Sequence, residues 1–420
     1  MQRQRSGLVA QLRQMNNEAA SAANRVSAIT TEVARLNQDI VQHESDGRSS
    51  ASALRDRRDG LLRELSEIVN VNVRYQENGV ANVYVGSTPL VEFNRARGLT
   101  IDRVYQDGLE LATVRFTDDG STADVRGGSL AAIVGTADSE VVQQLRALDE
   151  LAHGLIYEVN RVHSTGAGLV GLRQTTASYD VRDTAAALDS AEAGLAFPVR
   201  NGSFIVNVRD TYTGQVTTRQ IKVTLNGTAG GTSLNQLSAA LDGVPGLSAA
   251  LGADGRLSLK ADADTEFWFS EDSSGALAAL GVGTFFTGQT AADINVRGEV
   301  RSDPRLIAAS QSGAAGDGGN AGRLAVLGQQ SSGVLGTQSI HDFRARMVNA
   351  LAVSTASALN TYAAADTVHA SLTAQREAVA GVSLDEEALN LTVFERSFQG
   401  ASRFLNVINN LSNELLSLVQ

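Results

Sequence analysis

The sequence predicts an α+β protein, elongated and multidomain, in which a coiled-coil-like bundle of long helices carries inserted antiparallel β-rich domains. Two observations predict this fold class. Apolar residues recur in steps of three and four over long stretches near both ends of the chain, which is the period of a helix with one packed face. Between these stretches the period changes to two, and dipeptides such as Asn78-Gly79 and Asp119-Gly120 mark turns between strands. Because the chain leaves the helical pattern twice and returns each time, we expect the β-rich parts to be insertions.

The first helix is the element that the pattern predicts most directly. Apolar positions from Leu8 to Ile40 follow a heptad without interruption, and roughly forty helical residues would span on the order of 60 Å. A turn at 44–50 separates this helix from a second one at about 51–68. The expected divisions of the chain are long helices of the bundle domain (1–70), a small antiparallel β unit (71–128), a bundle helix (129–168), an inserted α+β outer domain (169–300), return helices of the bundle (301–380) and a C-terminal amphipathic helix (381–420).

The outer domain and the return to the bundle are predicted from shorter signals. Alternating apolar residues predict strands at 203–210, 216–225, 256–261 and 265–271, with a short amphipathic helix at 234–241. After residue 301 a helix is expected over the run DPRLIAAS, followed by a mobile glycine-rich loop from Gly313 to Gly322. A long helix at 339–378 is rich in small residues, which predicts close packing deep in the bundle.

The last helix is predicted to carry the function. Ser383 is expected to cap it, and Glu386 to complete the capping box. Since its apolar seam follows a break and has no obvious partner left in the chain, we expect the seam to pack on other subunits. The seam comprises Leu391, Phe394, Phe398, Ala401, Leu405, Ile408, Leu411, Leu415 and Leu418.

Composition excludes several function classes. The formal net charge of -11 would repel nucleic acid and anionic membrane surfaces, so neither is an expected partner, and no apolar run is long enough to be inserted in a membrane. The absence of cysteine excludes disulfides and thiolate metal sites. The five histidines have no metal-ligand spacing, and the acids fit helix surfaces and caps better than an acid/base pair. We therefore predict no cofactor, no metal site and no catalytic residue.

Several motifs together resemble the flagellar hook-associated protein 1 family. The run GVSLDEEALNL and the heptad helix after it are similar to the C-terminal signature of flagellar rod, hook and hook-associated proteins. The internal run LRDRRDGLL resembles the family's L-x-D-Q-R-D-x-L segment, with Asp56, Arg58, Asp59 and Leu61 in register and Arg57 in place of the usual glutamine. Further similar runs are Gly127-Gly128-Ser129-Leu130, LDELAHGLIYEVNRVHSTGAGL, FFTGQTAADINV and DPRLIAAS.

The resemblance implies a non-enzymatic structural protein that forms a ring of copies at the junction between flagellar hook and filament. It implies the hook protein, hook-associated protein 3, an export chaperone and the type III export apparatus as partners. The protein would be cytoplasmic before export and extracellular, in the flagellum, afterwards. In this family the terminal helices form the inner, axial layer of the tube. The family's usual N-terminal segment has no counterpart before Gln2, so the sequence is expected to lack part of the inner coiled coil and to polymerise poorly.

Other functions remain open at this point. Hook-associated protein 3 or a flagellin-like axial subunit shares the terminal helix, although the LRDRRDGLL segment and two β insertions disfavour both. A cell-wall hydrolase on a helical shaft would need a catalytic acid in a pocket, which murein hydrolysis assays would reveal. A coiled-coil surface adhesin would show in a cell-binding assay rather than as a motility defect.

Overall fold

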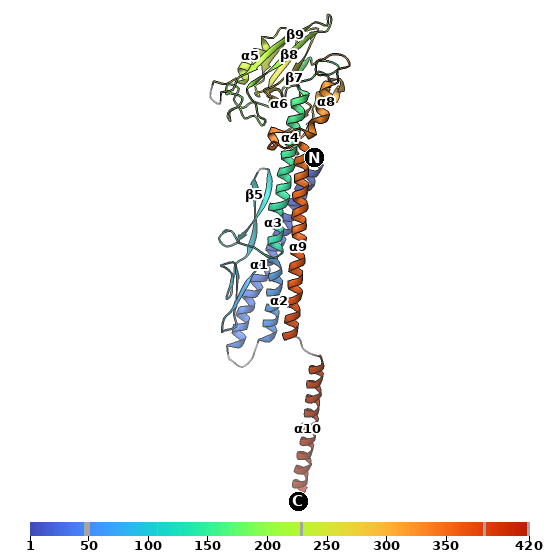
Figure 1. Cartoon of the computed structure of the whole chain (residues 1–420). Helices are drawn as coiled ribbons and strands as arrows, with labels where there is room; N and C mark the ends of the chain where they lie inside the picture. The colour runs from blue at the N-terminus through green and yellow to red at the C-terminus, as the bar shows by residue number, and fades with distance from the viewer. Residues whose placement is uncertain (46–50, 107, 227–229, 381–383, 418–420) are drawn as a thin grey trace. The chain divides into compact units, whose positions relative to one another are not determined.

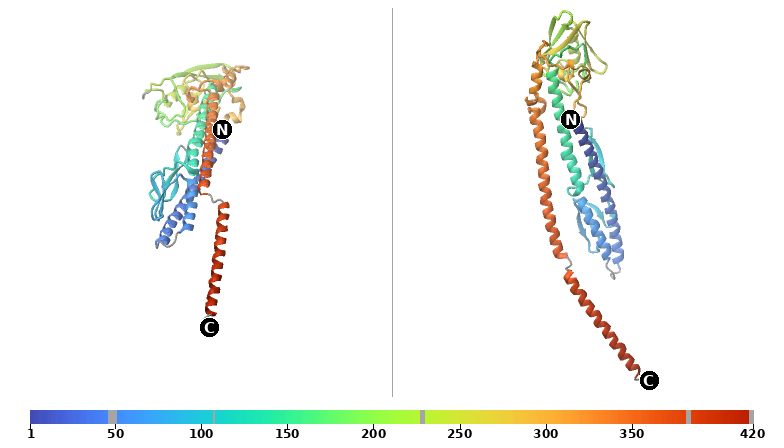
Figure 2. Two further views of the ribbon diagram at one scale, coloured as in Figure 1. Left: turned by 60° about the horizontal axis from the view of Figure 1, so that its bottom comes forward. Right: turned by 90° about the vertical axis from the view of Figure 1, so that its right-hand side faces the viewer.

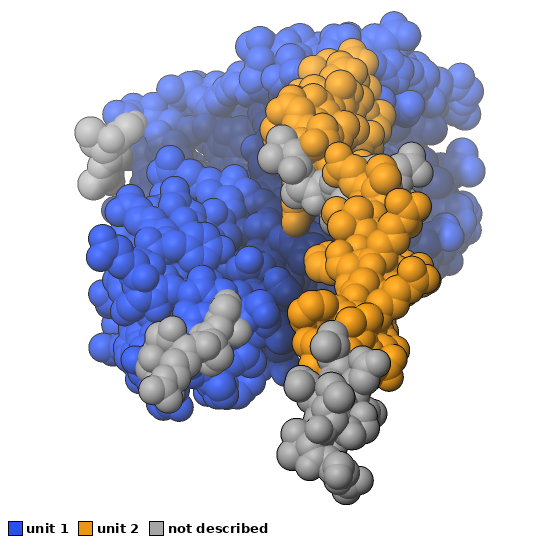
Figure 3. Space-filling view, turned by 90° about the horizontal axis from the view of Figure 1, so that it is seen from below, with its two compact units in different colours: residues 1–348 blue, residues 349–420 orange. Residues whose placement is uncertain are grey.

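Two compact units make up the structure, Met1–Val348 and Asn349–Gln420 (Figure 3). The computed structural model describes the following residues: 1–45, 51–106, 108–226, 230–380 and 384–417. Long helices and several small antiparallel sheets occur together, so the predicted α+β class is confirmed. The six-part division of the chain stays a prediction.

The helices of the described residues are α1 (Gln2–Glu44), α2 (Ser52–Ile68), α3 (Gly128–Thr136), α4 (Val142–His163), α5 (Leu234–Asp242), α6 (Ala276–Leu280), α7 (Gly298–Ser302), α8 (Gly319–Val326), α9 (Ile340–Ala380) and α10 (Leu384–Ser417). A π-helical turn, Ala137–Val141, joins α3 to α4, and short 3-10 turns lie at Pro304–Leu306, Leu327–Gln329 and Gly333–Leu335.

The strands are β1 (Asn72–Tyr75), β2 (Ala81–Val85), β3 (Thr88–Glu92), β4 (Arg95–Ala96), β5 (Leu99–Gln106), β6 (Leu109–Phe116), β7 (Gln174–Thr176), β8 (Gly202–Asp210), β9 (Val216–Val223), β10 (Leu247–Leu251), β11 (Leu257–Ala261), β12 (Thr265–Ser270), β13 (Phe286–Thr287) and β14 (Asn295–Val296). They pair antiparallel in the orders β1-β2-β3-β4, β5-β6, β10-β11-β7, β12-β8-β9 and β13-β14.

The long helix α1 organises the first unit. Its heptad positions are buried, with Val26, Val33 and Leu36 fully covered. They pack on α2, on α3 and on the sheets formed by β1 to β6, which lie beside α1 in Figures 1 and 2. Burying a side chain of this size stabilises the fold by roughly 1.5 to 3 kcal/mol, so this apolar face accounts for the unusual length of α1.

Three polar side chains on α1 fix where the strands sit on it. Asn16 donates through its amide to the backbone oxygen of Glu110 on β6, at 2.7 Å. The Ser27 hydroxyl both accepts from and donates to the backbone of Leu99 on β5, at 2.9 and 3.0 Å. Farther along, the Asn37 amide donates to the backbone oxygen of Ala81 on β2 at 2.8 Å and accepts the N–H of Ala81 at 3.0 Å. Because buried polar groups must be paired, these bonds select one register of strand on helix.

The outer part of the first unit is built around the sheet β12-β8-β9 and the sheet β10-β11-β7. Phe204, Phe267 and Phe269 project from β8 and β12 into one core and meet edge to face at ring centroid distances of 5.9 and 5.7 Å. The helix α5 covers this core and begins with a capping box between Ser233 and Gln236. The end of α4 reaches this outer part, where it contacts α6, α8 and β13.

The structure corrects two expectations for residues 301–322. The run DPRLIAAS is not a helix: only Pro304–Leu306 forms a 3-10 turn, and Ser310 then pairs with Ala167 as an isolated bridge. The glycine-rich segment is also not a loop throughout, since α8 begins within it. The Asp317 carboxylate accepts hydrogen bonds from the backbone and hydroxyl of Ser312 and from three further groups around the turn. One carboxylate thus bonds five groups within the glycine-rich segment and just before it.

Candidate functional site

Arg58 of the LRDRRDGLL motif is a buried structural residue. Its side chain is 1% exposed, and Nη1 donates to the backbone oxygen of Gly79 at 2.6 Å and to Oδ1 of Asn37 at 3.1 Å. The ring of Tyr75 lies 5.3 Å from the centre of its guanidinium group. Burial lowers the pKa of Arg58 from its usual value, but an arginine at this site stays charged. Arg58 therefore ties α2 to α1 and to the turn between β1 and β2.

The other motif residues lie around Arg58 with smaller roles. Asp59 accepts a hydrogen bond from the hydroxyl of Tyr75 at 3.3 Å, and Leu61 is half-buried against the core between α1 and α2. Asp56 is exposed. Arg57, which departs from the family pattern, is an exposed residue that forms an ion pair with Glu32 at 2.9 Å. The motif thus supports the joint between the first two helices and the β unit.

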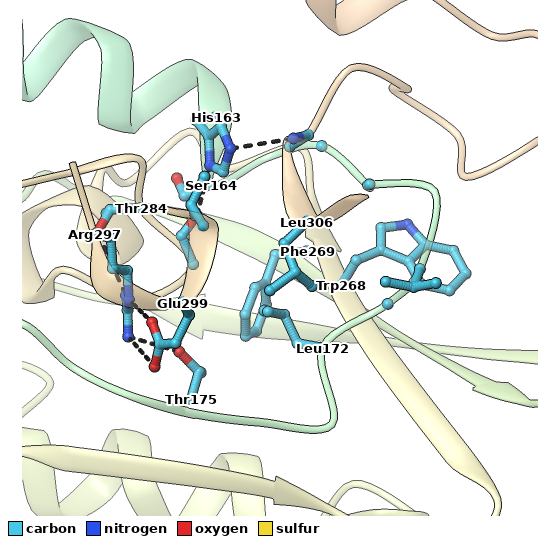
Figure 4. Close-up of a pocket in the computed structure, with 17 residues that line it drawn as sticks. His163, Ser164, Leu172, Thr175, Trp268, Phe269, Thr284, Arg297, Glu299 and Leu306 are labelled. Atoms are coloured by element: carbon cyan, nitrogen blue, oxygen red, sulfur yellow. Dashed lines mark hydrogen bonds and ion pairs between the residues drawn. The ribbon is translucent and has the colours of Figure 1, made fainter. Parts of the chain in front are cut away.

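A second cluster of buried polar residues joins the end of α4 to the outer part of the unit. We call it the α4 joint, and it consists of Asn160, His163, Arg297 and Asn320 (Figure 4 shows His163 and Arg297). Asn160 donates to the backbone oxygen of Phe286 at 3.0 Å and accepts from two backbone N–H groups. Asn320 donates to the backbone oxygens of Val162 and Ala308 at 3.1 and 2.7 Å. Each amide connects α4 to a segment more than 100 residues away in sequence.

Arg297 connects two further segments of the α4 joint, the one at Gly281 and the strand β7. Its guanidinium donates to the backbone oxygen of Gly281 at 2.8 Å, to the Thr175 hydroxyl at 2.8 Å and to the backbone of Thr176. It is also paired with Glu299. Arg297 could not be predicted as a functional residue, because a lone arginine after a short strand has no distinctive pattern.

His163 is held as a neutral ring. Nδ1 lies 2.9 Å from the backbone oxygen of Gly283, and Nε2 accepts the backbone N–H of Ala308 at 3.1 Å. These partners assign the proton to Nδ1, since a carbonyl only accepts and an N–H only donates. Burial lowers the pKa of His163 to about 4. The spacing of the histidines bears only on metal binding, so the structural role of His163 could not be predicted from it.

The pKa of His163 predicts a loss of stability in mild acid. The unfolded histidine has a pKa near 6.5, so the contribution is complete above that pH and is lost as the pH falls from about 6.5 toward 4. Between pH 7 and pH 4.5 the expected loss is roughly 2 kcal/mol. Urea denaturation at both pH values measures this decrease in the free energy of unfolding, which we call the acid loss. The acid loss should be smaller for His163→Asn than for the unmodified chain, by about this amount.

A matched control separates titration from packing. Asn160→Ala removes a member of the same joint that does not titrate, so it should lower stability at both pH values and keep the acid loss unchanged. If His163→Asn keeps the full acid loss, His163 does not cause it.

The apolar seam on α10 is the candidate assembly surface. Its described side chains are exposed, with Leu391, Phe394 and Phe398 at 68, 75 and 76%. Leu405 and Ile408 are exposed as well, and so is Ala401. The side chains of Leu411 and Leu415, and the whole of Ser383 and Leu418, lie outside the described residues. Glu386 lies in the first turns of α10.

A further apolar row on α10 was missed by the sequence analysis. Leu389, Val393, Phe404 and Val407 are also exposed, between 54 and 66%. At 100° per residue they fall on roughly the opposite side of the helix from Leu391 and Phe398. With Gly400 included, these residues are spaced by 4, 7, 4 and 3 positions, which also fits a heptad. The seam that contains Leu391 and Phe398 therefore accounts for only one of the two apolar faces. A helix that is apolar on two sides is typical of one covered by more than one neighbour.

Within the described residues, no group of three or more histidine, aspartate or glutamate side chains lies close enough to hold a metal ion. The pocket beside His163 has a cavity of about 30 Å³, which is too small for an organic substrate. None of the helices described is both long and apolar enough to cross a membrane.

Comparisons with known proteins agree with the motifs. A family model described as the flagellar hook-associated protein FlgK helical domain matches residues 1–177, which include Arg58 and His163. The flagellar hook-associated protein 1 of Escherichia coli (strain K12) is 24% identical over 429 residues, which cover 97% of this chain and 72% of that protein. The protein of the same name from Salmonella typhimurium is 24% identical over 423 residues, again with 97% and 72% coverage.

A solved structure, described as the flagellar hook junction protein FlgK from Burkholderia pseudomallei, is 14% identical and matches with a TM-score of 0.36. The match covers 73% of this chain, which spans about half, 54%, of the solved chain. A score this low does not establish a common arrangement of the elements. The sequence relatives and the helical-domain match show that the chain is similar to flagellar hook-associated protein 1, the resemblance that its motifs predicted.

Proposed function

We propose that this chain is a structural subunit of the junction between flagellar hook and filament, and that it associates with other copies through α10. The similarity to flagellar hook-associated protein 1 supports a place for this chain in the bacterial flagellum. The observation that supports the role of α10 is the row of exposed apolar side chains on this helix. Each would stabilise an interface by roughly 1.5 to 3 kcal/mol when fully buried, so a few of them suffice for a stable contact.

The proposed partners follow from this position. Copies of the chain would form a ring, with the hook protein on one side and hook-associated protein 3 on the other. Before export through the type III apparatus, the apolar surface of α10 would be bound by a chaperone, because a groove can cover an amphipathic helix. The chain would thus be cytoplasmic before export and extracellular in the flagellum. We propose no enzymatic role.

Immunogold labelling of isolated hook–filament structures with an antibody against this chain tests the proposal. Label is expected at one position, where hook meets filament. Label along the whole filament would instead indicate a flagellin-like subunit, and label on the cell surface away from flagella would indicate an adhesin. Release of soluble muropeptides from murein by the purified chain would indicate a cell-wall hydrolase. Each of these three results would overturn the proposal.

A further inference from the structure

The pocket at the α4 joint contains a buried hydroxyl that lacks a protein partner. Ser164, the residue that ends α4, is 2% exposed, and its Oγ has no hydrogen-bond partner among the residues the structure describes. A buried hydroxyl without a partner costs free energy comparable to a lost hydrogen bond. Native proteins therefore pair such groups, either with protein atoms or with ordered water.

The space next to this hydroxyl has the size of a water site. Ser164 lines the pocket beside His163, whose cavity volume is about 30 Å³. A cavity needs roughly 10 to 15 Å³ to hold one water molecule, so this pocket has room for it. Figure 4 shows the polar side chains Ser164, Thr284 and Arg297 on one side of the pocket, with Leu172 and Phe269 nearer its other side. The space is thus small, and one side of it is polar.

Two other hydroxyls in the pocket have spare bonding capacity. Thr175 Oγ1 accepts from Arg297 Nη2 at 2.8 Å, which leaves the threonine with its own proton to donate. Thr284 Oγ1 has only long contacts, 3.4 Å to the backbone oxygen of Gly281 and 3.5 Å to Arg297 Nη1. A site of neutral hydroxyls suits a neutral donor and acceptor. An anion is not favoured, because the Arg297 guanidinium is already paired with Glu299 and with backbone oxygens.

We propose that this pocket is a structural water site, in which an ordered water molecule bonds Ser164 Oγ and bridges it to the hydroxyls of Thr175 and Thr284. The water would connect the end of α4 to β7 and to the segment before α7. A groove of about 450 Å³ adjoins the pocket, since Leu172, Glu299 and Leu306 line both. The water thus completes the polar pairing of the α4 joint.

Two alanine variants test the proposal through the sign of their effect. If water pairs the Ser164 hydroxyl, Ser164→Ala removes a satisfied hydrogen bond and should lower the melting temperature of the full chain by about 2 °C. Ser332 is the matched control, since it is 1% exposed, its Oγ also lacks a partner, and it does not line this pocket. Ser332→Ala should leave the melting temperature unchanged or raise it, because Ser332 does not line this pocket and its removal takes away no bond to the proposed water.

A crystal structure of the full chain provides the second measurement. We expect electron density for a water within hydrogen-bond distance of Ser164 Oγ and of at least one threonine hydroxyl. Density showing the Ser164 hydroxyl bonded to a protein atom, with no water beside it, would overturn the proposal. So would a Ser164→Ala variant that is as stable as the unmodified chain or more stable.

Discussion

Arg58→Ala is expected to lower the free energy of unfolding of the first unit by roughly 3 kcal/mol, whereas Arg57→Ala should cost less than about 1 kcal/mol. The two arginines are adjacent, but only Arg58 is buried, and the Arg57 side chain is 63% exposed. Removing Arg58 leaves the backbone oxygen of Gly79 without its charged donor and opens a cavity beside Asn37. Removing Arg57 breaks only a solvated ion pair with Glu32.

Urea denaturation of the two variants at pH 7 measures this difference. Arg58→Lys is a further control, because lysine keeps the charge but replaces the planar guanidinium, whose Nη1 bonds both acceptors, by a more strongly hydrated ammonium group. It should fall between Arg58→Ala and the unmodified chain. Arg58→Met tests the opposite possibility, since an apolar side chain of similar length can replace a buried charge without loss. Should Arg58→Met equal or exceed the unmodified chain in stability, the guanidinium bonds make no net contribution.

The long helices could be predicted from sequence because their signal repeats many times. The heptad from Leu8 to Ile40 samples one packed face over nearly the whole of α1, and each step adds independent support. Short strands carry less information. The strand β10 contains only five residues, of which Leu247 alone is buried, so no alternation distinguishes it from a loop. Its place is set instead by pairing with β11, which sequence periodicity does not record.

The polar joints could not be predicted, because they depend on contacts between distant segments. The run from Leu54 to Leu62 contains five charged residues, a pattern typical of a solvated helix face, yet Arg58 within it is fully buried. Its partners Asn37 and Gly79 lie on other elements. His163 is similar, since Gly283 and Ala308 are 120 and 145 residues away. The family motif marked Arg58 as important without indicating why.

The seam on α10 shows a different limit of sequence reasoning. Periodicity correctly places Leu391, Phe394 and Phe398 on one face, but it does not say what covers that face. The exposed row that contains Val393 and Phe404 also fits a heptad. Assigning the heptad to the seam of Leu391 therefore leaves this second row without an assigned role. Only an experiment that changes the seam while the rest of the molecule stays folded can assign its partner.

Phe398→Asp combined with Leu405→Asp is expected to abolish incorporation at the junction while leaving the thermal transition of the first unit unchanged. Both side chains are exposed, at 76 and 60%, so replacing them removes no buried contact from the described structure. In an interface each loses roughly 1.5 to 3 kcal/mol of apolar burial, and the new carboxylates would also have to be desolvated. Together these losses correspond to a weakening of association by roughly a hundredfold or more.

A matched variant controls for the added charge. Gln399→Asp with Asn406→Asp introduces the same two carboxylates at the same spacing, one position farther along the helix. Because both residues are polar and exposed, this variant should still incorporate at the junction and bind the chaperone. The measurements are immunogold labelling of flagella, pull-down with the export chaperone, and calorimetry of the purified chains. If the Phe398 and Leu405 variant unfolds the first unit, the seam belongs to the core of its own chain, and the proposed assembly surface is wrong.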